Sequence, residues 1–363
     1  MAVTEQGLLA ALTSVQDPHT GQDFVSTRAL RNVQIHGGDV AFDVELGYPA
    51  KSLLPELRRS LVAAAKGVAG VENVSVNITT KVVAHAVQRG VQLLAQVKNI
   101  IAVASGKGGV GKSTTAANLA LALAAEGASV GVLDADIYGP SQPMMMGINR
   151  RPESDDGKTM EPLENYGVQV MSIGFLVDQD EAMIWRGPMA TQALEQLLRQ
   201  TNWKDLDYLI IDMPPGTGDI QLTLSQRVPM TGAVIVTTPQ DIALLDAKKG
   251  IKMFEKVGVP ILGIVENMAA HVCSNCGHVE HIFGADGGKK MAADYGMDYL
   301  GALPLDMSIR LQADSGKPTV VADPDGEVAQ IYKKVAREVA VKIARQAKDF
   351  SSKFPTISIS KNT

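Results

Sequence analysis

The chain has 363 residues, enough for two or three domains, and a formal net charge of −5 at pH 7. This mild acidity, without any basic run, excludes a dedicated nucleic-acid-binding protein, and two cysteines, Cys273 and Cys276, are too few for a disulfide scaffold. No apolar run is long enough to span a bilayer and the first residues do not resemble an export signal, so we expect a cytoplasmic protein with neither nucleic acid nor membrane among its partners.

Residues 1–90 are predicted to form a separate small α+β domain. Alternating apolar residues on both sides of Gly37 and Gly38 indicate a β-hairpin, and a helix with a proline in its first turn leads to another alternating strand. The predicted elements are a helix at 8–15, strands at 33–36 and 40–46, a helix at 53–65 and a strand at 71–78. The polar residues 81–98 show a helical tendency, and we assign 91–98 to a linker.

The order of these elements, with a turn at Asp17 and Pro18, resembles the small domain that often accompanies iron–sulfur assembly proteins. In stand-alone relatives a cysteine follows the second hairpin strand. The corresponding segment here, 47–52, contains no cysteine. The domain is therefore expected to have a structural or docking role.

A glycine-rich segment with the spacing G-x-x-x-x-G-K-S lies between an apolar strand at 100–104 and an Ala/Leu-rich helix at 115–125. Such a strand-to-helix turn, here called the P-loop (residues 106–114), binds phosphates, because its backbone N–H groups point inward and the helix N-terminus adds partial positive charge. Lys112 is expected to contact the β- and γ-phosphates and the Ser113 hydroxyl to bind Mg²⁺. The predicted nucleotide-binding residues of this segment are Gly106, Lys107, Gly108, Gly109, Val110, Gly111, Lys112, Ser113 and Thr114.

Lys107 is a second lysine near the start of this segment. The pattern Gly-Lys-Gly-Gly-Val-Gly-Lys-Ser-Thr resembles the deviant Walker A motif of the MinD/ParA/nitrogenase-iron-protein group, in which such a lysine contacts the nucleotide of a partner chain. The resemblance implies an ATPase that works as a face-to-face homodimer. A cation on the γ-phosphate would act as an arginine finger does, so Lys107 and Lys112 are both catalytic candidates.

Residues 99–350 alternate between strands and helices, which predicts an α/β fold, the doubly wound, mostly parallel sheet of a P-loop NTPase. Ligands bind such sheets at the carboxyl ends of the strands. The strand that starts at residue 130 ends in Asp134 and Asp136. We expect Asp136 to orient the attacking water, and the alternative is that both carboxylates cap turns. The loop at 137–143 has the composition of a nucleotide-sensing switch.

The strand at 206–212 is strongly apolar, ends in Asp212 and is followed by Met-Pro-Pro-Gly-Thr-Gly. This pattern is typical of a Walker B motif with a second switch, in which Asp212 holds Mg²⁺ through water and Gly216 senses the γ-phosphate. Asn267 ends a further strand that starts at residue 260. In relatives an asparagine here binds adenine, which favours ATP over GTP, and a helix or turn cap is the alternative.

Two further predictions concern other segments of the chain. A long helix over 327–348 is expected to pack on the sheet, and residues 351–363 are predicted to be a disordered tail. Arg186, just before a helix that runs to about residue 199, is a candidate contact to phosphate or to a partner chain.

Cys273 and Cys276 form a C-x-x-C pair. One pair offers two thiolates, whereas zinc and iron–sulfur clusters usually take four ligands. The chain could complete a zinc site with His278 and His281, or the pair could be a redox dithiol. Alternatively, two chains related by two-fold symmetry could each supply two thiolates to one 4Fe–4S cluster. We favour the last hypothesis because it uses the same dimer as Lys107.

Residues 98 to about 345 resemble the Mrp/ApbC family of iron–sulfur cluster carriers, through the P-loop, Asp-Ala-Asp-Ile-Tyr-Gly-Pro-Ser, Asp-Met-Pro-Pro-Gly-Thr-Gly-Asp and Cys-Ser-Asn-Cys-Gly. The resemblance implies that Cys273 and Cys276 receive a cluster from an upstream scaffold and deliver it to apo client proteins, with slow ATP hydrolysis at the P-loop. Relatives often have proline where this chain has Ser274, a change that removes no ligand. The alternative function is that of a MinD/ParA-like positioning ATPase without a metal cluster.

Overall fold

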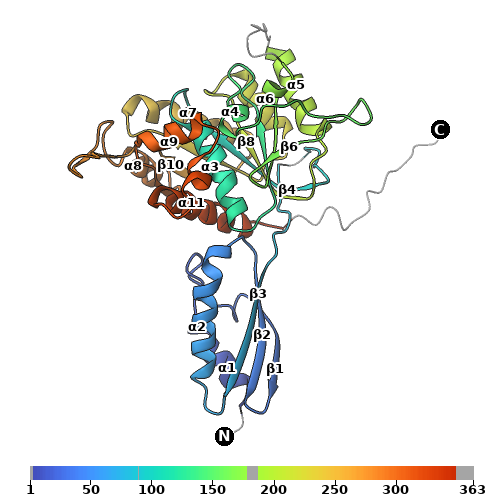
Figure 1. Ribbon diagram of the computed structural model, residues 1–363, viewed down its shortest axis with the longest axis vertical. Helices are drawn as coiled ribbons and strands as arrows, with labels where there is room; N and C mark the ends of the chain where they lie inside the picture. The colour runs from blue at the N-terminus through green and yellow to red at the C-terminus, as the bar shows by residue number, and fades with distance from the viewer. Residues whose placement is uncertain (1–2, 89, 178–186, 349–363) are drawn as a thin grey trace, which may run out of the picture.

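The computed structural model describes residues 3–88, 90–177 and 187–348, which form a small N-terminal domain and a larger α/β domain (Figure 1). Arg186 and the predicted tail at 351–363 lie outside the described residues. Among the helices of the described ranges, none is both long enough and apolar enough to cross a membrane.

The small domain is a three-stranded sheet with two helices. Its elements are α1 (Glu5–Leu12), β1 (Leu30–His36), β2 (Asp39–Leu46), a 3-10 turn at Lys51–Leu53, α2 (Leu54–Lys66) and β3 (Asn73–Thr80). β1 and β2 pair antiparallel, as the predicted hairpin requires, and β3 joins β2 in parallel. The parallel pairing is possible because α2 forms the crossover between β2 and β3.

The alternation of residues along β2 decides which face of this sheet is buried. Every second β2 residue is apolar and at most 3% exposed, whereas the residues between them are more exposed; the buried set is Val40, Phe42, Val44 and Leu46. The apolar residues of α2 are spaced one turn apart and supply the facing layer, with Leu57, Leu61 and Ala65. Each larger side chain in this core contributes about 1.5–3 kcal/mol to stability.

The segment between the domains, 81–96, contains no helix in its described part, so the helical tendency was a wrong prediction. Long-range contacts hold it instead. The buried His85 ring donates from Nδ1 to Asn99 Oδ1 at 3.0 Å, and Asn99 Nδ2 donates to the Val83 carbonyl at 3.0 Å. These bonds fix the segment against the first strand of the larger domain, and such tertiary contacts override a weak helix propensity.

The larger domain is built on an eight-stranded sheet, with a separate two-stranded hairpin. The sheet strands are β4 (Val97–Ala104), β5 (Val130–Asp134), β6 (Leu163–Asn165), β7 (Val168–Ser172), β8 (Leu206–Asp212), β9 (Gly232–Thr237), β10 (Ile261–Glu266) and β13 (Tyr299–Ala302), and the hairpin strands are β11 (His271–Val272) and β12 (Val279–Glu280). The spatial order is β13-β10-β9-β4-β8-β5-β7-β6, and every sheet pairing is parallel except β6 with β7. The predicted mostly parallel sheet is therefore confirmed.

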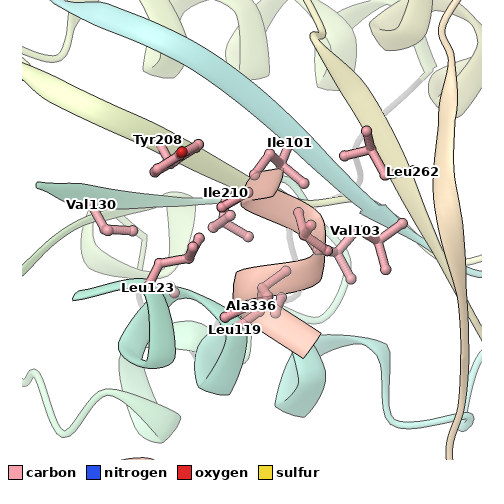
Figure 2. Close-up of a cluster of buried hydrophobic side chains, with 14 of the residues drawn as sticks. Ile101, Val103, Leu119, Leu123, Val130, Tyr208, Ile210, Leu262 and Ala336 are labelled. Carbon is pink, nitrogen blue, oxygen red and sulfur yellow. The ribbon is translucent and has the colours of Figure 1, made fainter. Parts of the chain in front are cut away.

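Helices cover both faces of this sheet. One group of mutually contacting helices is α3 (Lys112–Ala125), α4 (Gln142–Met145), α9 (Met307–Asp314), α10 (Thr319–Ala322) and α11 (Glu327–Ala344), and the other is α5 (Gly187–Gln200), α6 (Asp219–Arg227), α7 (Asp241–Lys256) and α8 (Gly287–Asp294). Figure 2 shows Leu119 and Leu123 of α3, with Ala336 of α11, beside Ile101 and Ile210 of the central strands. All five are fully buried, so α11 packs on the sheet as predicted.

α11 also lies at the boundary with the small domain (Figure 1). Arg337 Nη1 contacts Glu126 Oε1 at 2.6 Å, and the Ser52 hydroxyl donates to the same oxygen at 2.6 Å. His19 Nδ1 lies 2.9 Å from Glu338 Oε1. Because Glu126 follows the last residue of α3, the small domain is attached to the C-terminal end of the P-loop helix.

Candidate functional site

The glycine-rich segment lies between the end of β4 and the start of α3, at the carboxyl edge of the sheet. Gly109 and Gly111 have φ angles of 79° and 81°, in the left-handed region that favours glycine. Gly106 has no room for a side chain, because a Cβ there would overlap the backbone of Asp246 in α7. The glycines therefore allow the tight strand-to-helix turn that binds phosphates in P-loop proteins.

Lys112 connects this turn to the end of β8. Its side chain is only 6% exposed, and Nζ contacts Asp212 Oδ1 and lies 3.1 Å from Ser113 Oγ. Asp212 is fully buried, so without the ammonium its charge would be uncompensated. A hydroxyl and a carboxylate beside one cation are also ligand types that suit Mg²⁺. Two motifs about a hundred residues apart in the sequence thus meet at one point.

The two carboxylates that follow β5 differ in burial. Asp134 is fully buried, and its Oδ2 accepts a hydrogen bond from the Ser172 hydroxyl at 3.1 Å. Burial and then the neighbouring Asp212 charge raise the pKa of Asp134 to about 7. Asp136 is half-buried, and its backbone N–H donates to Asp134 Oδ1 at 3.1 Å. Burial also raises the pKa of Asp136, while the Lys112 charge opposes that shift.

Gln142 is a site residue that sequence reasoning missed. It is fully buried at the start of α4, and Nε2 donates to Asp212 Oδ2 at 2.9 Å and to the Ser113 carbonyl at 3.1 Å. Its backbone N–H donates to Asp134 Oδ2 at 3.0 Å. The only signal in the sequence is one amide within the prolines and methionines of residues 140–146.

The segment after β8 is fixed to the residue that precedes the P-loop. Gly216 has a φ of 97°, and its N–H donates to the Ser105 carbonyl at 3.1 Å. Gln221 Nε2 donates to the Pro215 carbonyl. The predicted second switch therefore lies directly beside the phosphate-binding turn.

Lys107 belongs to the P-loop, whereas Asn267 contacts the P-loop from the end of β10. Asn267 directly follows β10, is 8% exposed, and donates from Nδ2 to the Val110 carbonyl at 2.9 Å. In this structure Asn267 thus supports the P-loop backbone. Lys107 is half-buried, and its carbonyl accepts a hydrogen bond from the Ser105 hydroxyl at 2.8 Å, which fixes the backbone under the lysine.

The cysteines lie in the turn between β11 and β12. Cys273 N–H donates to the His278 carbonyl at 2.9 Å, and Gly277 N–H donates to the Cys273 carbonyl at 2.8 Å. Both thiols are free; Cys273 is half-buried and Cys276 is exposed. Hydrogen bonds from the backbone N–H groups of Asn275 and Cys276 lower the pKa of Cys273. These bonds favour its thiolate, the form that binds metals.

The nearby histidines are not arranged around the thiols. His281 Nδ1 donates to the Ala269 carbonyl at 2.8 Å and His271 Nδ1 to the Leu305 carbonyl at 3.0 Å, since a carbonyl can only accept. Within the described ranges, no group of three or more His, Cys, Asp or Glu side chains is placed to hold a metal ion. Within the described residues, His278 and His281 are therefore not gathered with the two thiols into a four-ligand zinc site.

Two family models match the chain. One, described as a NUBPL iron-transfer P-loop NTPase, matches residues 96–340, and the other, described as an iron–sulfur cluster assembly protein, matches residues 5–78. An iron–sulfur cluster carrier protein of Escherichia coli (strain K12) is 51% identical over 333 residues, 92% of this chain and 90% of that protein. The iron–sulfur cluster transfer protein NUBPL of Mus musculus is 56% identical over 245 residues, 67% of this chain and 77% of that protein.

Solved structures agree on the larger domain. A nucleotide-binding protein of Archaeoglobus fulgidus, in complex with ADP, has a TM-score of 0.56 at 38% identity, over 64% of this chain and 90% of that one. The cell division ATPase MinD of Pyrococcus furiosus has a TM-score of 0.50 at 23% identity, over 66% of this chain and 98% of that one. This likeness shows a common fold. The resemblance to iron–sulfur cluster carriers that the motifs indicated is confirmed by the Escherichia coli and Mus musculus relatives. Because the first family model matches residues 96–340, more than half of the chain, the chain belongs to the family of NUBPL iron-transfer P-loop NTPases.

Proposed function

We propose that the protein is a dimeric, ATP-dependent carrier that takes up a 4Fe–4S cluster as cargo and passes it to apo client proteins. The observation that carries the proposal is the pair of free thiols, Cys273 and Cys276, with no third metal ligand beside them in the described ranges. A 4Fe–4S cluster takes four thiolates, and two chains related by two-fold symmetry supply four. The names of the relatives, cluster carrier and cluster transfer protein, support this cargo.

Exposed apolar side chains on the cysteine hairpin support a cluster site shared between two chains. Val272 and Val279, which flank the cysteines, are 52% and 51% exposed. Exposed apolar side chains beside a two-ligand site favour contact with a second surface. A second copy of the chain would cover these valines and supply the missing thiolates.

The nucleotide part of the proposal rests on the P-loop, and the family supports NTPase activity in general. MgATP is the proposed substrate, with its phosphates on residues 106–114. Ser113 and Asp212 would hold Mg²⁺, which would neutralise phosphate charge. The ammonium of Lys112 beside both side chains supports this assignment, because the pair already accommodates a cation. We propose in addition that hydrolysis is slow and is coupled to cluster carriage.

Three residues complete the proposed catalytic arrangement. Lys107 of one chain would contact the γ-phosphate bound by its partner and stabilise the transition state. Asp136, whose charge lies close enough to Lys112 to be affected by it, would orient the attacking water. Asn267 would contact adenine through Oδ1, since its Nδ2 is bonded to the Val110 carbonyl.

A short path connects the nucleotide to the cysteines. Asn267 is bonded to the P-loop, and only residues 268–272 separate it from Cys273. Within this path Ala269 donates from its N–H to the Leu303 carbonyl at 3.0 Å and accepts from His281. We propose that a change at the P-loop is transmitted through these residues, so that nucleotide state alters how tightly two chains hold the cluster.

The proposal leaves the upstream scaffold and the client proteins as partners to be identified, and a cytoplasmic location stays a prediction from the sequence. The rival function is a MinD/ParA-like positioning ATPase, which the common fold with MinD permits. Such a protein needs no metal. A Cys273→Ser, Cys276→Ser variant would then retain full function in cells.

The test is anaerobic reconstitution with iron and sulfide. We expect about four irons per two chains, a visible absorbance band and a dimeric native mass for the wild type, and none of the iron in the Cys273→Ser, Cys276→Ser variant. A Ser274→Ala variant, changed between the same two cysteines, is the control and should retain the iron. Iron uptake that does not depend on the cysteines, or zinc in its place, would overturn the carrier proposal.

A further inference from the structure

Gln142 is a buried amide at the junction of the P-loop, the Walker B strand and the loop after β5. Three hydrogen bonds hold it, to Asp212 Oδ2, to the Ser113 carbonyl and, from its backbone, to Asp134 Oδ2. Burying an amide is unfavourable unless it is hydrogen-bonded, and bonds to a carboxylate are among the strongest. A residue needed only to fill this space would be apolar, as the adjacent Pro143 is.

The contacts of Asp212 show what Gln142 adds. In this structure Lys112 contacts Asp212 Oδ1 and Gln142 Nε2 donates to Oδ2 at 2.9 Å. If Lys112 moves to contact a bound phosphate, the Gln142 side chain is the donor that remains hydrogen-bonded to the Asp212 carboxylate. Gln142 would then keep Oδ2 occupied and leave Oδ1 directed toward the metal.

The second atom of the amide is also informative. Gln142 Oε1 is buried and has no hydrogen-bond partner within the described residues. A buried acceptor without a donor is rare in native proteins, so a water molecule, an ion with its hydration shell or a ligand is needed to supply the donor. Water on a bound magnesium ion is a donor of this kind, and Ser113 and Asp212, the proposed magnesium residues, both contact the same amide.

We propose that Gln142 is a positioning residue of the magnesium site, which orients Asp212 and couples the metal to the loop at 137–141. That loop leads directly into Gln142, and Met144, two residues further along α4, is 60% exposed. Binding or loss of the metal would thereby change the position of exposed residues of α4. The proposal rests on nucleotide binding alone, so it stands even if the cysteines carry no cluster.

The test compares nucleotide affinity with and without magnesium in the cluster-free protein. The equilibrium affinity for a fluorescent ATP analogue is measured in excess Mg²⁺ and in EDTA, for the wild type, Gln142→Met and Gln142→Asn. The first variant removes the amide at similar length, and the second retains it one methylene shorter. Gln330→Met is the matched control, because Gln330 is an exposed glutamine of α11 whose Nε2 donates to a backbone carbonyl at 3.1 Å.

We expect both Gln142 variants to lose more affinity for the analogue in excess Mg²⁺ than in EDTA, since the orientation of Asp212 matters only when the metal is bound. The gain in affinity that Mg²⁺ provides should fall by about tenfold, the usual effect of losing one hydrogen bond to a charged group. Gln330→Met should keep the full gain. If the gain is unchanged in both variants, or if affinity falls equally in Mg²⁺ and EDTA, Gln142 only packs the site and the proposal is wrong.

Discussion

The nucleotide site and the cysteine hairpin differ in how much of each site one chain supplies. At the P-loop, Lys112, Asp212 and Gln142 are buried and bonded to one another, so the cation and carboxylate positions exist before a nucleotide binds. At the hairpin, two strands of two residues each support one half-buried and one exposed thiol. The first site is organised within the chain, and the second is open.

This difference fits the two proposed tasks. A nucleotide site gains from being formed in advance, because fixed charges need no reorganisation when the reaction occurs. A cargo site must also release its cargo. Four ligands from one chain would hold a cluster until the chain itself unfolded locally, whereas two ligands from each of two chains are separated by any motion that opens the dimer.

The largest effect is expected from Lys112→Met, which removes the cation from the organised site. Nucleotide binding should be lost, and the free energy of unfolding should fall by about 3–5 kcal/mol because Asp212 becomes a buried, unpaired charge. Lys249→Met in α7 is the control, since its pair with Asp246 is largely exposed and should change stability by less than about 1 kcal/mol. Denaturant titration and nucleotide titration measure both quantities. Unchanged stability of Lys112→Met would mean that the pair does not hold Asp212.

Lys107→Ala should leave stability and nucleotide affinity unchanged but lower the rate of ATP hydrolysis by about a hundredfold or more, as the loss of a charge-stabilising finger does. Mixing tests whether the lysine acts on the partner. Lys107→Ala and Lys112→Met chains are each inactive, yet a mixed dimer would combine an intact P-loop with an intact Lys107 from the other chain. Recovery of hydrolysis on mixing supports action across the dimer, and its absence contradicts the homodimer hypothesis.

The organised site was also the more predictable one. Its P-loop and Walker B motif follow from local spacing between a strand and a helix, and the strand-helix alternation predicted the mostly parallel sheet. Gln142 was missed because its partner Asp212 lies 70 residues away, and no local pattern marks such a pair. The contacts that replace a helix near His85 are likewise long-range, because they depend on Asn99.

The link between the two sites can be weakened at Asn267. Asn267→Ala removes the hydrogen bond to the Val110 carbonyl, and nucleotide affinity should fall by about five- to tenfold. The response of cluster uptake to nucleotide should fall with it. Asn73→Ala is a matched control, since its Nδ2 donates to Asp39 Oδ1 at 2.8 Å in the sheet of the small domain. Iron uptake is measured with and without ATP; an undiminished response in Asn267→Ala would exclude the path through residues 267–273.

The smallest expected effect concerns the pH dependence of the organised site. Burial and the Asp212 charge raise the pKa of Asp134 from 3.8 to about 7, so the native state holds this proton more tightly than the unfolded chain does. Stability from the protonated carboxyl is therefore complete below about pH 4 and is lost as pH rises toward 7. Relative to Asp134→Asn, which cannot ionise, the melting temperature of the nucleotide-free wild type should fall by about 2–4 °C between pH 5 and pH 8. Over this range the pKa difference costs roughly 2–3 kcal/mol of stability, and in a chain of 363 residues each kcal/mol shifts the melting temperature by little more than about 1 °C. Parallel melting curves would show that Asp134 does not change its protonation state between pH 5 and pH 8, which would contradict this prediction. The proton of Asp134 would then make no pH-dependent contribution to stability, and the contacts of Lys112, Gln142 and Ser172 would have to account for the stability of the buried carboxyl groups.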